Sequence, residues 1–212
     1  MTTLLFLRHG YSIYNARGLF SGQADIPLDA RGEAQARDAA EYILSHYTVD
    51  RIYSSDLCRA VATATPVAEA LSLPVLTDPA LRELDVGLWQ GLPFATVMER
   101  YPESYALYKT NPGRGCPDGG ESYSALIERS ARATQRIAEE NDGKTVLIST
   151  HGGFIRCLRC AWERVPLDEV KNVPHLPNAS LSVGEFENGR GRFTEIGRCD
   201  YLSDNVTEFR IV

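Results

Sequence analysis

Apolar runs of strand length recur along the chain and alternate with more polar segments. Runs of this kind, bounded by turn residues, are typical of buried strands, so we expect strands at these places. They span residues 3–7, 51–54, 73–76, 144–149, 179–186 and 192–196. The run at 144–149 is almost continuously β-branched or apolar, which favours a central parallel strand covered on both faces. The last two runs are joined by a turn at 187–191 and are predicted at a sheet edge.

Between the predicted strands, apolar residues recur every three or four positions, which is the spacing of one helix face. These stripes predict helices at about residues 34–47, 57–71, 121–137 and 154–162. Ser55 and Asp56 precede the second stripe, and their side chains are expected to cap that helix. The alternation predicts an α/β fold: a three-layer sandwich with a mainly parallel central sheet and helices on both faces.

Residues 92–120 break this alternation and are predicted to be the least regular part of the chain. They contain four prolines, four glycines, and tyrosines at positions 101, 105 and 108. No internal repeat, low-complexity tract or linker divides the sequence. We therefore expect one domain over residues 1–212, which is long enough to bury a full core.

The composition is that of an ordinary soluble globular protein, with 43% hydrophobic and 24% charged residues. The formal net charge of −6 argues against a general nucleic-acid or acidic-membrane surface. The apolar run before Arg8 is only four residues long, from Leu4 to Leu7, and no later stretch approaches the roughly 20 that a membrane helix needs. The five scattered cysteines indicate a reduced, cytoplasmic compartment, with Cys157 and Cys160 predicted as small core-facing thiols.

Two of the four histidines directly follow predicted strands, and each precedes a glycine. These are His9, which comes after Arg8, and His151. If the two strands are parallel neighbours, both imidazoles face one crevice at the carboxyl edge of the sheet. A lone buried histidine is more often a packing residue, but two in matched settings favour a site. His46 and His175 lack this setting and are interpreted as surface or packing residues.

Charged residues near other strand ends extend this candidate site. Arg8 is suited to bind phosphoryl oxygens bidentately while His9 attacks or transfers protons. Arg59 is expected in the first turn of a helix, where the dipole also favours an anion; the alternative is an exposed helix arginine. Glu83 would repel a dianion unless it is protonated and donates to a leaving group; the alternative is a salt bridge with Arg82.

Five sequence blocks, taken in order, resemble those of the histidine phosphatase superfamily, the clan that includes cofactor-dependent phosphoglycerate mutases. The resemblance covers nearly the whole chain. The first block is Arg8-His9-Gly10 with Ser12 and Asn15, and the second is residues 20–28 together with Gly32 and residues 35–36. The third block is residues 54–60 with Thr63. The fourth is Arg82-Glu83-Leu84 with Gly87, Trp89 and Gly91, and the fifth is His151-Gly152-Gly153. Tyr11 departs from the family pattern, which more commonly has an acidic residue or glutamine at that position.

The resemblance implies that His9 is the nucleophile and is phosphorylated on a ring nitrogen. It assigns Glu83 to protonate the leaving group and then to help deprotonate water. Arg8, Arg59 and His151 would hold the phosphoryl oxygens, and neighbouring positive charge should lower the pKa of His9 and keep it nucleophilic. The substrate-binding residues that it implies are Asn15, Ser12, Ser21, Gly22 and Gly152. We expect neither a metal nor a cofactor, because no carboxylate cluster or zinc-type histidine spacing is present.

Three features favour a phosphatase over a mutase. Residues 82–91 and 117–122 resemble the phosphatase branch, and residues 92–120 hold only three basic residues, whereas mutases carry a lysine and paired arginines for the substrate carboxylate. The tail after Tyr201 is also short for a lid that would keep water from a phosphohistidine. We therefore expect a phosphomonoesterase. A phosphoglycerate mutase is the alternative, and an inactive phospholigand-binding module is less favoured because every expected position is filled.

The expected partner is a small-molecule phosphate ester, such as a sugar phosphate, a glycolytic acid phosphate or a ribazole phosphate. Neither nucleic acid nor a membrane is expected, and the sequence does not indicate the oligomeric state. Residues 92–120 are predicted to form a cap-like segment that sets substrate specificity. Its three tyrosines would either line the pocket or pack within a helical hairpin.

Overall fold

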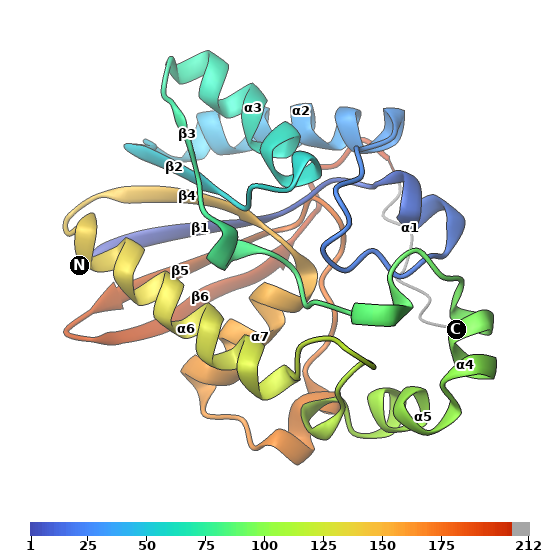
Figure 1. The fold of residues 1–212 in the computed structure, drawn as a ribbon. Helices are drawn as coiled ribbons and strands as arrows, with labels where there is room; N and C mark the ends of the chain where they lie inside the picture. Colours follow the sequence, from blue (N-terminus) through green and yellow to red (C-terminus); the bar gives the residue numbers. More distant parts are fainter. Residues whose placement is uncertain (205–212) are drawn as a thin grey trace.

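Six strands of the described chain form one mixed sheet in the order β3–β2–β4–β1–β5–β6 (Figure 1). The computed structural model describes residues 1–204, so most of the tail after Tyr201 lies outside the described residues. The strands are β1 (Thr2–Arg8), β2 (Arg51–Ser54), β3 (Val75–Thr77), β4 (Thr145–Thr150), β5 (Leu181–Glu187) and β6 (Arg190–Arg198). The first four strands are parallel, and β5 and β6 extend the sheet in antiparallel pairing.

The mainly parallel sandwich predicted from the sequence is confirmed. β4 lies between β2 and β1, pairs in parallel with both, and is buried from Val146 to its end. β6 forms the expected edge. The third strand begins at Val75 rather than at residue 73, because Ser72 adopts a left-handed conformation and the Leu73 N–H still donates to the helix carbonyl of Ala68.

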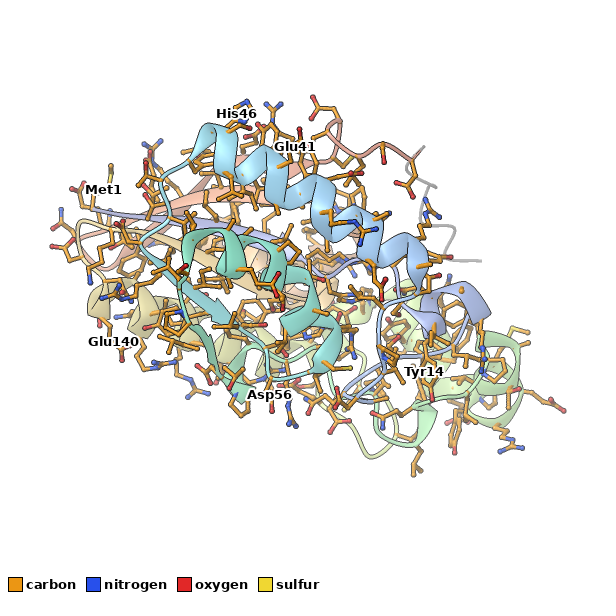
Figure 2. The ribbon with its side chains drawn as sticks, turned by 90° about the horizontal axis from the view of Figure 1, so that it is seen from above. Met1, Tyr14, Glu41, His46, Asp56 and Glu140 are labelled. Carbon is orange, nitrogen blue, oxygen red and sulfur yellow. The ribbon has the colours of Figure 1, made fainter. Side chains whose placement is uncertain are left out.

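Helices cover both faces of this sheet. Figures 1 and 2 show α2 and α3 side by side on one face, with α6 and α7 on the other. The helices are α1 (Ile13–Arg17), α2 (Ala30–His46), α3 (Cys58–Leu71), α4 (Phe94–Arg100), α5 (Pro102–Thr110), α6 (Tyr123–Glu140) and α7 (Gly152–Glu163). Short 3₁₀ turns are η1 (Pro79–Leu81), η2 (Gly87–Trp89), η3 (Pro112–Arg114) and η4 (Leu167–Asn172).

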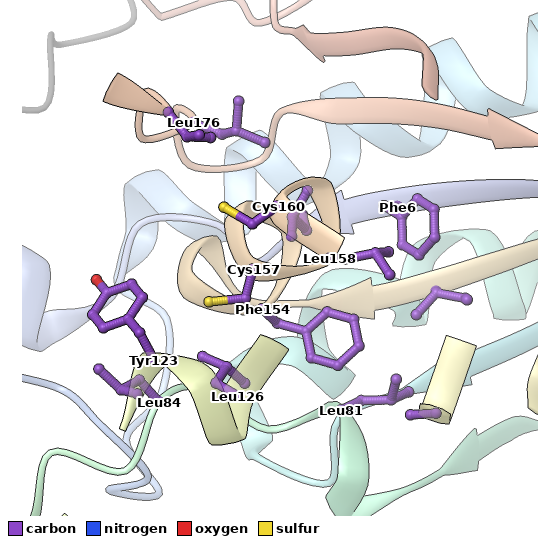
Figure 3. Packing of buried hydrophobic residues seen from close by; sticks show 14 of the residues in the cluster. Phe6, Leu81, Leu84, Tyr123, Leu126, Phe154, Cys157, Leu158, Cys160 and Leu176 are labelled. Carbon is purple, nitrogen blue, oxygen red and sulfur yellow. The ribbon is translucent and has the colours of Figure 1, made fainter. Parts of the chain in front are cut away.

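The core has two layers because alternate side chains of a strand point to opposite faces of the sheet. Leu5 and Leu7 pack in the cluster under α2 and α3, whereas Phe6 packs in the larger cluster under α6 and α7 (Figure 3). Cys157 and Cys160 are fully or almost fully buried in that larger cluster, so their prediction as core-facing thiols is confirmed. Within residues 1–204, no helix combines the length and apolar composition that a membrane span requires.

The predicted cap of α3 is wrong. The helix begins after Leu57, which makes no side-chain cap, and the Asp56 carboxylate instead pairs with Arg82, whose Nε donates to it at 2.7 Å. The N–H of Cys58 donates to the Asp25 carboxylate at 2.7 Å. The helix start is therefore capped by a residue distant in sequence, which a local pattern does not predict.

Residues 92–120 are more regular than predicted, because they contain α4, α5 and η3. Three of the four prolines stand at helix starts: Pro93 precedes the first residue of α4, and Pro102 and Pro112 open α5 and η3. Proline is well tolerated at that position, because its missing N–H has no partner in the first turn anyway.

Candidate active site

A cavity of about 130 Å³ lies where the carboxyl ends of the parallel strands meet the starts of α3 and α7. This is the usual ligand position in open α/β sheets. The loop after β1, the first turns of α3 and α7, and the 92–120 segment all contribute to its lining. The polar residues of that lining are Arg8, His9, Asn15, Ser21, Arg59, Glu83, Tyr105, Tyr108, Lys109, Tyr123 and His175.

The two strand-exit histidines come together. The ring centroids of His9 and His151 are 5.2 Å apart, and both side chains are buried. Nδ1 of His9 lies 2.7 Å from the carbonyl oxygen of Gly10. A carbonyl only accepts, so Nδ1 carries the proton and Nε2 keeps a lone pair. His9 therefore has the tautomer that a nucleophilic nitrogen requires.

Burial lowers the pKa of both imidazoles well below the ordinary value, and the positive charges of Arg59 and Arg8 lower each further. Both rings are therefore neutral at physiological pH. Neither ring nitrogen of His151 has a hydrogen-bond partner within the described residues. Because buried polar groups are normally paired, His151 has donor or acceptor capacity available beside His9 for a bound anion.

Two buried guanidinium groups flank these rings. Arg59 donates to the carbonyl oxygens of Ala24 at 2.6 Å and Gly22 at 2.8 Å, which fixes the loop that follows α1. Arg8 donates to the carbonyl oxygen of Leu176. Burial lowers the pKa of Arg8 to about 10, which leaves it cationic at neutral pH. Such desolvated arginines bind phosphoryl oxygens strongly.

The start of α7 adds a third source of positive potential. His151 is the N-cap of this 12-residue helix, and Gly152 opens it. A Cβ on Gly152 would lie 3.1 Å from Nε of Arg8, so the absence of a side chain lets the guanidinium pack close to the helix start. The dipole of the helix and its first N–H groups favour an anion there.

Glu83 lines the same cavity as Arg8 and Arg59, and it is the one carboxylate among the described residues that do so. Its oxygens accept from the N–H of Leu84 at 2.8 Å and the N–H of Gly153 at 3.0 Å. The alternative salt bridge with Arg82 is excluded, because Arg82 pairs with Asp56. The electrostatic influence of the Glu83 carboxylate reaches both Arg8 and Arg59 and opposes the fall in their pKa values.

Arg129 of α6 holds the backbone that carries Glu83. Its guanidinium donates to the carbonyl oxygens of Ala80 at 2.9 Å, Arg82 at 2.8 Å and Glu83 at 3.1 Å. The same group makes a bidentate pair with Glu121, at 2.9 and 2.6 Å. No motif in the sequence indicated this role. Arg129 therefore fixes the position of the carboxylate without lining the cavity.

Four of the predicted substrate-binding residues line the cavity: Asn15, Ser21, Gly22 and Gly152. Ser12 does not. Its hydroxyl caps α1 and donates to Oδ1 of Asn15 at 2.9 Å, so it orients Asn15. Tyr11 does not line the cavity either.

Asn178 was missed by the sequence analysis. It donates to the carbonyl oxygen of His9 at 3.0 Å and to Oδ1 of Asn15 at 3.3 Å. It lies just before β5, the strand that pairs with β1, and only that pairing brings it to the site.

Two of the three tyrosines of residues 92–120 line the cavity, as one of the two interpretations expected. Tyr105 and Tyr108 line the cavity, whereas Tyr101 does not and packs against Trp89, with centroids 6.4 Å apart. The interpretation of His175 as a surface or packing residue is wrong, because it lines the cavity. His46 is exposed at the end of α2, as expected. Within the described residues, no group of three or more His, Cys, Asp or Glu side chains could hold a metal ion.

Comparison with models of known protein families identifies the family of this chain. The model of the histidine phosphatase superfamily (branch 1) matches residues 4–198. The chain belongs to the histidine phosphatase superfamily. The resemblance noted in the sequence is thereby confirmed, and the matched region includes every residue that lines the cavity.

The similar proteins within this superfamily are named either as phosphatases or as phosphoglycerate mutases. The chain is 34% identical to a metal-independent phosphoserine phosphatase of Arabidopsis thaliana, over 86% of this chain and 76% of that protein. It is also 34% identical to a 2,3-bisphosphoglycerate-dependent phosphoglycerate mutase 2 of Gloeobacter violaceus, over 95% of this chain and 94% of that protein. Among solved structures, mycobacterial glucosyl-3-phosphoglycerate phosphatase superposes with a TM-score of 0.85 at 30% identity, covering 93% and 99% of the two chains.

Proposed function

We propose that this histidine phosphatase is a phosphomonoesterase that hydrolyses a small phosphorylated metabolite through a phosphohistidine on His9. One observation carries the proposal: a neutral His9 with a bare Nε2 lines a cavity together with Arg8, Arg59 and Glu83, which is the one carboxylate among the described lining residues. The buried ring of His151 does not line the cavity but lies 5.2 Å from that of His9. This set supplies a nucleophile, charge stabilisation for a phosphoryl group, and a proton donor.

In the first step, Nε2 of His9 forms a bond to phosphorus as the bond from phosphorus to the ester oxygen breaks. Glu83 transfers a proton to the leaving oxygen, so that an alcohol departs rather than an alkoxide. Arg8, Arg59 and His151 bind the equatorial oxygens, where charge accumulates in the transition state. In the second step, water attacks phosphorus, Glu83 accepts its proton, and inorganic phosphate and free His9 are released.

The relatives and the cavity support a small substrate. The Arabidopsis relative is named for phosphoserine and the mycobacterial structure for glucosyl-3-phosphoglycerate, and both names denote phosphate esters of metabolites. We propose that residues 92–120 act as the cap of a single domain over 1–212 and set specificity, because Phe94, Tyr105, Tyr108 and Lys109 line the cavity. The five free cysteines support a cytoplasmic location.

A panel assay tests the proposed activity. Purified protein is incubated with phosphoserine, 3-phosphoglycerate and sugar phosphates, and inorganic phosphate is measured. We expect phosphate release from at least one ester of this panel. Absence of release from every ester would contradict the proposal.

Phosphoglycerate mutase is the second candidate, favoured by the similarity to the mutase of Gloeobacter violaceus. Against it, Lys109 is the one basic residue of the 92–120 segment that lines the cavity, because neither Arg100 nor Arg114 reaches the lining. A coupled assay separates the two: isomerisation of 3-phosphoglycerate without net phosphate release identifies a mutase, and stoichiometric phosphate release identifies a phosphatase.

Substitution of Gly153 by alanine is expected to lower kcat/KM for alkyl phosphates by about 10²-fold. A Cβ at this position would lie 2.0 Å from Oε1 of Glu83, so the carboxylate must move. The fold should be kept, because the atom displaced is the end of the flexible Glu83 side chain, and the helix preference of alanine over glycine offsets part of the hydrogen bonding that the carboxylate loses. Steady-state kinetics and a thermal melt measure both effects, and unchanged alkyl phosphate hydrolysis would show that the position of Glu83 is not critical.

Treatment with EDTA is expected to leave kcat unchanged within error. The positive charge that the reaction needs comes from the two buried arginines and the start of α7, so we propose a metal-independent mechanism. Phosphate release is measured before and after dialysis against the chelator. A loss of activity that added Mg²⁺ or Zn²⁺ restores would contradict this mechanism.

A further inference from the structure

The segment that carries Glu83 belongs to no helix or strand. Residues 82–86 run between η1 and η2, and Leu84 and Val86 are buried in the larger core cluster (Figure 3). Buried backbone groups are normally paired, and here the partners that a helix or a sheet would provide are missing. Side chains from elsewhere in the chain must therefore bind this segment, and they decide where the Glu83 carboxylate lies.

The guanidinium of Arg129 on α6 uses every one of its donors for this purpose. Nη1 donates to the carbonyl oxygens of Ala80 at 2.9 Å and Arg82 at 2.8 Å. Nη2 donates to the carbonyl oxygen of Glu83 at 3.1 Å and to the Glu121 carboxylate at 2.6 Å. Nε donates to the other oxygen of that carboxylate at 2.9 Å. An arginine has five N–H groups, so none of them is left over.

Glu121 binds the same segment beyond Glu83. Its backbone N–H donates to the carbonyl oxygen of Asp85 at 2.8 Å, and its Oε2 accepts from the N–H of Asp85 at 3.4 Å. The side chains of Arg129 and Glu121 are only 20% and 16% exposed, so this ion pair is better sheltered than a surface pair. Neither residue lines the cavity. The pair therefore holds the backbone on both sides of Glu83 from outside the cavity.

We propose that Arg129 and Glu121 are positioning residues for the proton transfers of Glu83, and that their effect on activity depends on the leaving group. The inference rests on the proposed phosphatase function. Proton transfer needs donor and acceptor within hydrogen-bond reach, so a small shift of the Glu83 backbone is enough to impair it. Arg8 and Arg59 are bound to carbonyl oxygens elsewhere in the chain, so their hold on the phosphoryl group should not change.

The variant Arg129→Lys tests this role. Lysine keeps the charge but has three N–H groups on one atom, so it cannot serve three carbonyls and both carboxylate oxygens. We expect kcat/KM for glycerol 3-phosphate to fall about 10- to 100-fold, and that for p-nitrophenyl phosphate less than about threefold. A merely structural role would lower both values equally. Arg132→Lys, at an exposed arginine of the same helix, is the matched control and should change neither.

The variant Glu121→Gln tests the other half of the pair and does not depend on whether Arg129→Lys folds. Glutamine keeps the size of the side chain and the backbone bond to Asp85, but its amide nitrogen cannot accept from the guanidinium. We expect kcat/KM for glycerol 3-phosphate to fall about 3- to 10-fold, with p-nitrophenyl phosphate unaffected. Glu128→Gln is the control, and thermal melts of all variants measure the fold separately.

A double-mutant cycle shows whether Arg129 acts through Glu83. In the Glu83→Gln background, the side chain that Arg129 positions no longer transfers a proton. Adding Arg129→Lys should therefore lower kcat/KM for glycerol 3-phosphate by less than about twofold more. If the two losses multiply instead, Arg129 acts on another part of the site and the inference is wrong.

The outcomes separate this inference from the proposed function. Equal losses on the two esters in the single variants, or no loss on either, would overturn the positioning role while phosphatase activity stands. A wild-type protein that hydrolyses neither ester, nor any ester of the panel assay, would overturn the proposed function itself.

Discussion

Replacing His9 with alanine is expected to reduce turnover by about 10⁴-fold or more, because the variant has no nitrogen to accept the phosphoryl group. Arg8 and Arg59 remain, so the variant should still bind phosphate esters, which calorimetry can measure. Alkali-quenched reactions of the wild type with labelled substrate should contain a phosphoenzyme that survives the quench and loses its label on later treatment with acid. The same experiment on His9→Ala should yield none.

His46 provides a control for this experiment. It is an exposed histidine in the last turn of α2 (Figure 2), and its ring stacks on Tyr42 with centroids 4.1 Å apart. It does not line the cavity. His46→Ala should keep the wild-type rate and the phosphoenzyme. If His9→Ala retains substantial activity or still traps labelled phosphate, another residue is the nucleophile and the proposed mechanism is wrong.

Replacing Glu83 with glutamine is expected to slow hydrolysis of alkyl phosphates by about 10²- to 10⁴-fold, and that of aryl phosphates far less. An alkoxide is a poor leaving group and needs a proton as the bond to phosphorus breaks, whereas a phenolate departs without one. Glutamine keeps the size of the side chain but has no acidic proton. Values of kcat/KM for glycerol 3-phosphate and p-nitrophenyl phosphate measure the difference.

Glu128 offers a matched control, because it is an exposed glutamate of α6 whose one described ion pair is with Arg132 on the same helix. Glu128→Gln should leave both substrates unaffected. If kcat/KM of Glu83→Gln falls equally for alkyl and aryl phosphates, Glu83 is not the proton donor and acts only through its charge. The Gly153→Ala variant should share the selective pattern, since both changes act on the same carboxylate.

Much of the fold follows from local patterns. The continuous apolar run at 144–149 predicted a central parallel strand, and the stripes at helical spacing predicted the four long helices, since both signals depend on which faces each element must bury. The same patterns placed His9 and His151 at strand exits. Two strands in parallel register, with Arg8 paired to Thr150, bring those exits to one edge of the sheet.

Local patterns were misleading where a residue has more than one structural use. Proline was interpreted as a sign of irregular chain in residues 92–120, yet Pro93, Pro102 and Pro112 stand at helix starts. Asp56 has the chemistry of a helix cap, but it pairs with Arg82 instead. In both cases the residue type is compatible with more than one structural role, and contacts with the rest of the fold determine which role it takes.

The sequence by itself determined the alternation of elements, the family, and the type of chemistry at the strand exits, because each is encoded in the spacing of neighbouring residues. Only the tertiary structure decided which side chains support that chemistry. Arg129 holds the backbone of Glu83, and Asn178 bonds to the backbone of His9. Both contacts join residues far apart in the chain, so they depend on how the layers pack rather than on any local pattern.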